Sequence, residues 1–132
     1  MVGIDGLHGK FAGILRIDPR KRTIEVLASG GLLTTGRVSG VAVAPDGTIY
    51  AIYQTSVHGQ PEHLVKIDPL SGAVSSLARV SHAMAIGMDN QGRAMMSAPL
   101  LQTVYLWDGK TATPWVQGAA VGKAFGVAFS PE

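Results

Sequence analysis

The chain has no cysteine among its 132 residues. This absence excludes disulfides, thiolate catalysis and zinc–thiolate sites, and it is compatible with any redox compartment. Charge is also scarce, because charged residues make up 15% of the chain against about 25% in ordinary globular proteins. We therefore expect a partner to cover part of the surface. The net charge is +2, and the basic residues are scattered apart from "RKR" at 20–22, so the composition does not indicate nucleic-acid binding.

Long hydrophobic runs are missing as well. The first ten residues, "MVGIDGLHGK", contain glycines and an aspartate where a signal peptide would place an apolar run. No window approaches the ~20 apolar residues of a membrane-spanning helix. We therefore expect a soluble cytoplasmic protein that binds neither membranes nor nucleic acids. A fragment of a longer secreted chain is the alternative.

What is present is repetition. One motif occurs three times, with starts 45 and 41 residues apart: "GVAVAPDG" at 40–47, "AIGMDNQG" at 85–92 and "GVAFSPE" at 126–132. A second motif also occurs three times, with starts 50 and 40 residues apart: "ILRIDPRKRTIEVLA" from Ile14, "LVKIDPLSGAVSSLA" from Leu64 and "VYLWDGKTATPWVQG" from Val104. Repeats of ~40–50 residues indicate a propeller or a solenoid.

The content of each repeat favours the propeller. The most complete repeat contains four short apolar runs, near 41–44, 48–53, 64–67 and 73–79, separated by turns rich in Pro, Asp and Gly. The segment "SSLARVSHAMAIGM" has some helical character, but it aligns with strand, turn and strand in the neighbouring repeat. Four antiparallel strands per repeat make one propeller blade. Glycine and alanine gather in the first strand of each repeat, where blades converge on a central axis.

Counting by type gives three copies of each of the four strands. The remaining strands are expected near 2–5, 13–17, 23–28, 85–88, 93–97, 103–107, 112–117 and 126–129. The chain is then a single all-β half-propeller over 1–132. It has strands two to four of one blade in 1–30, full blades at 38–80 and 83–118, and a closing first strand at 124–132.

Three blades are too few to close a ring, since propellers typically have four to eight. We expect a homodimer that forms one six-bladed ring, in which the C-terminal strand of each chain pairs with the N-terminal strand of the other. This exchange removes exposed edges. The residues expected at the closure are Val2, Ile4, Phe125, Val127 and Phe129. The alternative is a fragment of a longer six-bladed chain.

The phrases "GVAVAPDGTIYA" and "LVKIDPLSGAV" resemble six-bladed propellers of the gluconolactonase, strictosidine synthase-like and NHL-repeat group. The resemblance extends from Ile14 to Pro131. It implies the architecture but not an activity, because the group includes lactonases, synthases and binding modules. Its metal-dependent lactonases hold a divalent cation with carboxylate and amide side chains at the mouths of the first strands, and this sequence departs from that pattern.

At the corresponding positions, three residues before the aligned first strands, stand Arg37, His82 and Lys123. In a ring of two chains they would place six cations or imidazoles around one channel mouth, which favours an anion over a metal ion. Three solvated loop residues without a shared role are the alternative. His8 and His58 occupy aligned loops, "LHGK" and "VHGQ", on the same face. They are interpreted as polar loop residues, with a histidine metal site as the alternative.

Most acidic residues fall at the opposite face, in Asp-Pro, Asp-Gly and related turns, and are interpreted as structural. These are Asp18, Asp46, Asp68, Asp89, Asp108 and Glu132. Four aromatic residues have strand spacing and are expected to pack between blades, and Trp115 is expected in an outer strand and exposed. The packing group is Tyr50, Tyr53, Trp107 and Phe125.

The favoured function is a binding module for a small anionic ligand or an acidic peptide, contacted by the five basic and imidazole residues named above, with no cofactor and no metal. The first alternative is a lactonase-like hydrolase with His82 or Asp5 as general base, with or without a metal ion. The second is a scaffold that binds proteins through its outer edges.

Overall fold

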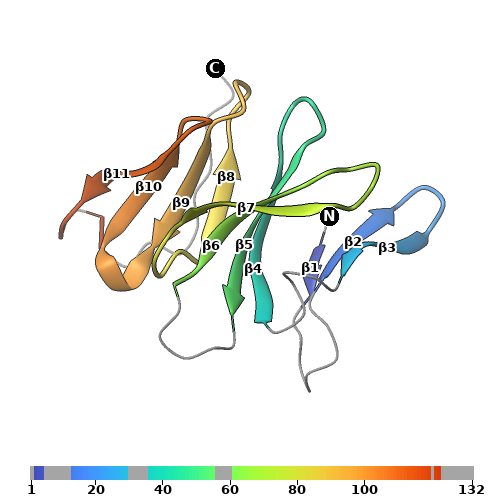
Figure 1. The fold of residues 1–132 in the computed structure, drawn as a ribbon, viewed down its shortest axis with the longest axis horizontal. Coiled ribbons are helices and arrows are strands. Elements are labelled where there is room, and N and C mark those ends of the chain that lie inside the picture. Colours follow the sequence, from blue (N-terminus) through green and yellow to red (C-terminus); the bar gives the residue numbers. More distant parts are fainter. Residues whose placement is uncertain (1, 5–12, 30–35, 56–60, 120, 123–132) are drawn as a thin grey trace.

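The computed structural model describes residues 2–4, 13–29, 36–55, 61–119 and 121–122. Within them it shows an all-β chain of three antiparallel sheets, side by side as a fan (Figure 1). The first sheet contains β1 (Val2–Ile4), β2 (Gly13–Asp18) and β3 (Thr23–Ser29). The middle sheet contains β4 (Gly36–Val43), β5 (Ile49–Thr55), β6 (His63–Ile67) and β7 (Val74–Arg79). The third sheet contains β8 (Ala85–Met88), β9 (Ala94–Ala98), β10 (Thr103–Trp107) and β11 (Ala112–Gln117).

The prediction of an all-β chain is confirmed, and each of the eleven described strands overlaps a predicted one. Among the described residues the sole helical element is a single 3₁₀ turn, η3 (Pro99–Leu101). Residues 75–88, which had some helical character in sequence, form strand, turn and strand as predicted. The twelfth strand, predicted near 126–129, lies outside the described residues.

The three sheets repeat one another in detail. In each of them the third and fourth strands of the repeat pair with a register shift at the same place, between Ile14 and Leu15, between Leu64 and Val65, and between Val104 and Tyr105. The extra residue opposite the shift is Leu27, Leu77 or Trp115. A bulge is a specific local feature that bends the strand and increases its twist. Its recurrence shows that the sequence repeats are structural repeats.

One first strand is longer than predicted. The sequence places it near 41–44, whereas β4 begins at Gly36. A register shift between Val38 and Gly40 leaves Ser39 as an extra residue, and pairing with β5 continues beyond it, with Arg37 opposite Gln54. Residues 36–40, "GRVSG", lack the apolar character of a strand, so the sequence did not predict that they pair with β5. Arg37 is consequently a strand residue and not a loop residue.

Small residues in the first strands allow adjacent sheets to approach closely, as predicted. β4 contacts both β1 and β8. A Cβ atom added to Gly40 would lie 3.2 Å from the Ile86 side chain and 3.4 Å from the Met84 carbonyl oxygen. A Cβ atom there would thus make a tight contact, and a side chain longer than that of alanine would separate the middle and third sheets.

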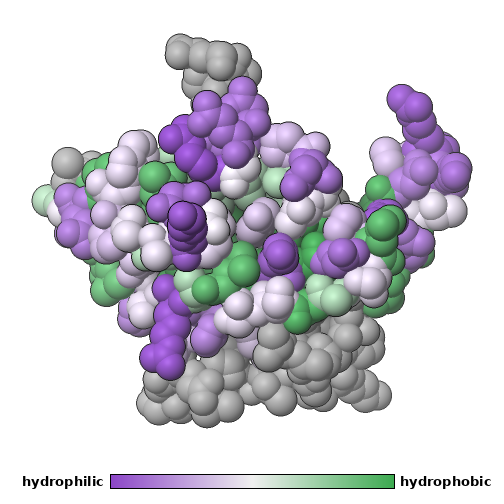
Figure 2. Space-filling view, turned by 45° about the horizontal axis from the view of Figure 1, so that its top comes forward, coloured by the Kyte–Doolittle hydropathy of each residue, from purple (hydrophilic) through white to green (hydrophobic). Residues whose placement is uncertain are grey.

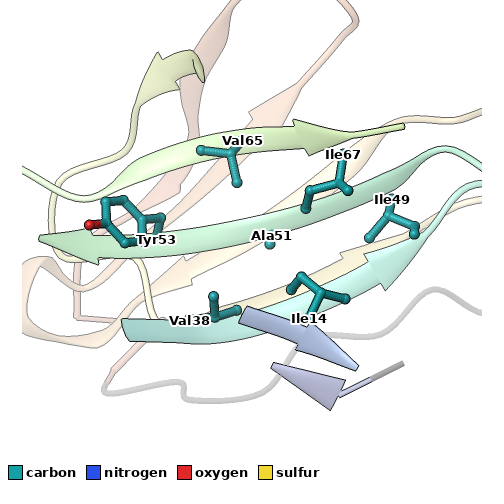
Figure 3. Close-up of a cluster of buried hydrophobic side chains, with 7 residues drawn as sticks. All are labelled: Ile14, Val38, Ile49, Ala51, Tyr53, Val65 and Ile67. Carbon is teal, nitrogen blue, oxygen red and sulfur yellow. The ribbon is translucent and has the colours of Figure 1, made fainter. Parts of the chain in front are cut away.

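Two hydrophobic clusters fill the spaces between the sheets. The first cluster joins the first and middle sheets and consists of Ile14, Val38, Ile49, Ala51, Tyr53, Val65 and Ile67 (Figure 3). The second joins the middle and third sheets and consists of Ile52, Leu64, Val80, Ala83, Ala94, Met96 and Trp107. Alternate residues of β5 point into the two clusters, because successive side chains of a strand face opposite sides. This explains why "IYAIY" is apolar without alternation.

Arg16 adds a polar link between the first two sheets. Its guanidinium donates 3.1 Å to the Glu25 carboxylate within the first sheet and 2.9 Å to the backbone carbonyl of Pro69 in the β6–β7 turn. The arginine stem lies on the same side of β2 as Ile14, since the two residues are two positions apart. The link therefore borders the first hydrophobic cluster.

Candidate functional site

The sheets have two chemically different ends. At the upper end in Figure 1, tight hairpin turns join β2 to β3, β4 to β5, β6 to β7, β8 to β9 and β10 to β11, and we call it the turn end. The opposite end, where β4, β6, β8 and β10 begin, we call the loop end. Figure 2 shows hydrophilic side chains covering the projecting turns of the turn end.

The predicted structural role of the turn aspartates is confirmed for the five that are described. Each accepts backbone N–H bonds from residues two to four positions later: Asp18 from Arg20 and Lys21, Asp46 from Thr48, Asp68 from Leu70 and Ser71, Asp89 from Gln91 and Arg93, and Asp108 from Lys110 and Thr111. These are Asx turns. Glu132 lies outside the described residues.

These hydrogen bonds favour the ionised carboxylates. They lower the pKa of Asp46, Asp68 and Asp108 below the ordinary value. Burial acts in the opposite direction on Asp89, but bonds from the Arg93 backbone and guanidinium outweigh it and the pKa of Asp89 is also lowered. The turn end thus uses its acidic groups to hold hairpins.

Arg37 lies at the loop end, second in β4 and exposed. Its Nε donates to the Gln54 amide oxygen across the strand pair, at 2.5 Å. A guanidinium carries five N–H donors, and Gln54 accepts one of them. Gln54 was not predicted as a site residue. It orients Arg37 from a rigid strand pair.

His82 also lies at the loop end, in the turn between β7 and β8. Its φ of 60° falls in the left-handed region, which is uncommon for residues other than glycine. The Glu62 carboxylate accepts the His82 backbone N–H at 2.6 Å, and the Glu62 carbonyl accepts the N–H of Val80 at 2.9 Å. Glu62 therefore fixes the turn that presents the exposed imidazole.

Arg37 and His82 share one end of two neighbouring strands. Arg37 stands three positions before Gly40, and His82 stands three positions before Ala85. Gly40 lies against the backbone of Met84, which precedes β8, and of Ile86, which is in β8. β4 and β8 both lead to turns at the turn end (Figure 1). The two residues thus belong to one region, although Arg37 is in a strand and His82 in a turn.

Glu62, His63 and Tyr105 are polar residues that were not predicted; Glu62 and His63 lie where β6 begins, at the loop end, and Tyr105 is near enough to Glu62 to respond to its charge. Burial raises the pKa of the Tyr105 hydroxyl, and the nearby negative charge of Glu62 raises it further. His63 Nδ1 lies 3.1 Å from the Ser76 hydroxyl. Glu62 is the sole acidic residue at the loop end in the part of the chain that the structure describes. Neither repeat alignment nor composition marks these residues, because their roles depend on contacts with residues that are distant in sequence.

The other predicted site residues lie outside the described ranges. These are Lys123, His8, His58, the closure residues Phe125, Val127 and Phe129, and Asp5. Val2 and Ile4 are in β1, which pairs with β2. Trp115 is 58% exposed, and Tyr53 and Trp107 are buried, as predicted. Tyr50 packs against the second cluster.

Neither a metal-binding cluster nor a membrane-spanning helix is present among the described residues. No group of three or more His, Asp or Glu side chains in these ranges is arranged to hold a metal ion. None of their helical segments has the length and apolar character required to cross a bilayer.

Comparison with known proteins gives no assignment. No protein-family model matches the chain, and no curated protein matches it.

Proposed function

We propose that the chain is one half of a six-bladed β-propeller and that it acts as a binding module for a small anionic ligand at the loop end. The architecture is supported by three meander sheets with the same bulge in the same place and by close approach of their first strands. The proposed architecture also agrees with the resemblance of the sequence to gluconolactonase, strictosidine synthase-like and NHL-repeat propellers. Two copies would supply the six blades.

The observation that carries the binding function is the fixed position of Arg37. Gln54 holds the guanidinium by its Nε from a paired strand, so the group does not need to be ordered when a ligand arrives. Preorganised donors lose less conformational entropy on binding. A planar guanidinium also matches carboxylate and phosphate geometry. His82 adds an exposed imidazole in the same region, on a turn fixed by Glu62.

The test compares anion binding by two arginine variants. Arg79 is the matched control, because it is an exposed arginine at the same end but on the outer strand β7, opposite His63. Inorganic phosphate and citrate, at matched ionic strength against chloride, should raise the melting temperature of the wild type and of Arg79→Ala. The rise should be lost in Arg37→Ala, and isothermal titration should show the same order.

Two outcomes would refute the proposal. Phosphate stabilises many proteins by exclusion from their surface, so an equal rise in all three proteins would mean a general salt effect. The proposal would also be refuted if neither phosphate nor citrate raised the melting temperature of the wild type above its value in chloride.

A further inference from the structure

The first and third sheets each have an apolar outer face that no described sheet covers. Residues at equivalent positions of the repeats differ sharply in burial. Ile17, Ile67 and Trp107 stand at equivalent positions, at or one residue before the end of the third strand of each repeat. They pair with Ile24, Val74 and Ala112, respectively. Ile67 and Trp107 are 0% and 4% exposed, but Ile17 is 41% exposed.

The difference in burial depends on whether a neighbouring sheet covers that side of the strand. Ile67 belongs to the first cluster, where the first sheet covers it. Trp107 belongs to the second cluster, where the middle sheet covers it. No described sheet covers the corresponding side of the first sheet. We call this side the rear face, formed by Leu15, Ile17, Ile24 and Val26. Ile24 and Val26 are 67% and 58% exposed.

The opposite side of the third sheet shows the complementary pattern. The extra residue of the bulge packs toward the next sheet in the first two repeats, as Leu27 against the first cluster and Leu77 against the second. The equivalent residue in the third repeat, Trp115, is 58% exposed. We call this side the front face, formed by Val104, Leu106, Trp115 and Val116.

The described part of the chain thus has one uncovered rear face, on the first sheet, and one uncovered front face, on the third sheet. Of the nine large hydrophobic side chains that are exposed among the described residues, five lie on these two faces: Ile17, Ile24, Val26, Trp115 and Val116. The first and third sheets stand at opposite ends of the fan (Figure 1), and hydrophobic side chains are visible at the end of the molecule that the first sheet occupies (Figure 2). The two faces therefore do not meet within one chain.

We propose that the front face of each chain packs on the rear face of a second copy. Front-to-rear packing already occurs twice within the chain, between the first and middle sheets and between the middle and third sheets. A second copy presents both required faces at once, so a twofold arrangement forms two identical junctions. This inference rests on the proposed propeller and names its partner surface. In the dimer Trp115 takes the place that Leu27 and Leu77 take inside the chain.

The experiment uses one lysine substitution on each face and one control. Light scattering should give twice 13.8 kDa for the wild type and the single-chain mass for Ile24→Lys and Trp115→Lys. Both side chains are exposed in the chain itself, so both variants should keep the fold, which circular dichroism checks. Leu70→Lys is the matched control, because Leu70 is 95% exposed on a turn of the middle sheet, away from both faces, and it should remain dimeric.

Mixing the two monomeric variants tests the front-to-rear geometry. Ile24→Lys retains an intact front face and Trp115→Lys an intact rear face, so an equimolar mixture should recover dimer through one good junction. A rear-to-rear dimer would be broken by Ile24→Lys alone, and a front-to-front dimer by Trp115→Lys alone. Either single effect would overturn the proposal, as would a wild-type chain that stays monomeric at its highest soluble concentration.

Fluorescence quenching gives a second measurement on the unaltered chain. The sequence has two tryptophans, and Trp107 is buried in the chain itself. Acrylamide quenching of Trp115 should therefore increase on dilution as the dimer dissociates, and unchanged quenching over the dissociation range would overturn the proposal. The Arg37-dependent anion response is measured separately in the monomeric Ile24→Lys variant. Loss of the dimer and loss of anion binding are thus distinguishable.

Discussion

Gly36→Ala should be among the most damaging single substitutions in the middle sheet. A Cβ atom added to Gly36 would lie 1.9 Å from the Gln54 carbonyl oxygen and 2.8 Å from two atoms of the Tyr53 ring. Ordinary contact begins near 3.4 Å, so the first pair of atoms would have to separate by about 1.5 Å. The oxygen belongs to the backbone of β5, which pairs with β4 on one side and β6 on the other. It cannot yield as a flexible side chain would.

The cost follows from that geometry. Overpacking typically destabilises by about 1–3 kcal/mol, and a forced backbone shift lies at the upper end, at about 3 kcal/mol. Gly40→Ala is the comparison, because its nearest neighbour would be a side-chain atom at 3.2 Å. A shift of a few tenths of an ångström relieves this contact, and the loss of backbone freedom in the unfolded chain offsets part of the strain. Gly40→Ala should therefore change the free energy of unfolding by less than about 1 kcal/mol.

Urea unfolding of both variants and the wild type, at one protein concentration, measures the difference. With a slope of about 2 kcal/mol per molar urea, Gly36→Ala should lower the midpoint by about 1.5 M. Because Gly36 precedes Arg37, the same variant should also weaken the anion response through a displaced guanidinium. A loss for Gly36→Ala no larger than that for Gly40→Ala would refute the close contact with β5.

Three further predictions concern burial and titration. Ile67→Ala should cost about 2–5 kcal/mol because it leaves a cavity in the core, whereas Ile17→Ala, tested in the monomeric Ile24→Lys variant, should cost about 1 kcal/mol. Equal losses in urea unfolding would contradict the exposed rear face. The turn aspartates with lowered pKa values should stabilise the fold fully above their unfolded pKa near 3.8 and lose this contribution as pH falls through their lower folded values. Melting temperatures between neutral and acidic pH should show this, and Asp68→Asn should reduce the acid-dependent loss; an unchanged profile would contradict it. Glu62→Gln should lower the raised pKa of Tyr105, since it removes a nearby negative charge, and an unmoved phenolate absorbance titration would show that burial alone sets the shift.

Two residues of the candidate site could be selected from the sequence alone. Their equal spacing before aligned first strands marked Arg37 and His82 as candidates, and both lie at the loop end. Their different local settings were not predictable. Strand pairing across the Ser39 bulge draws Arg37 into β4, and the Glu62 carboxylate holds the His82 turn. Both effects depend on partners that are distant in sequence, Gln54 for Arg37 and Glu62 for His82, and neither partner belongs to a recognisable motif.

The sequence by itself determined the strands, their order and their turns. Strand alternation, β-branched and aromatic runs and Asp-containing turns act over a few residues, so a local pattern is sufficient to specify them. Only the tertiary structure decided which apolar side chains are covered. Ile17 and Ile67 have the same residue type and the same place in the repeat, yet their exposed fractions are 41% and 0%. Burial is a property of the neighbouring sheet and not of the strand itself, and the first sheet has no described neighbour on its rear face.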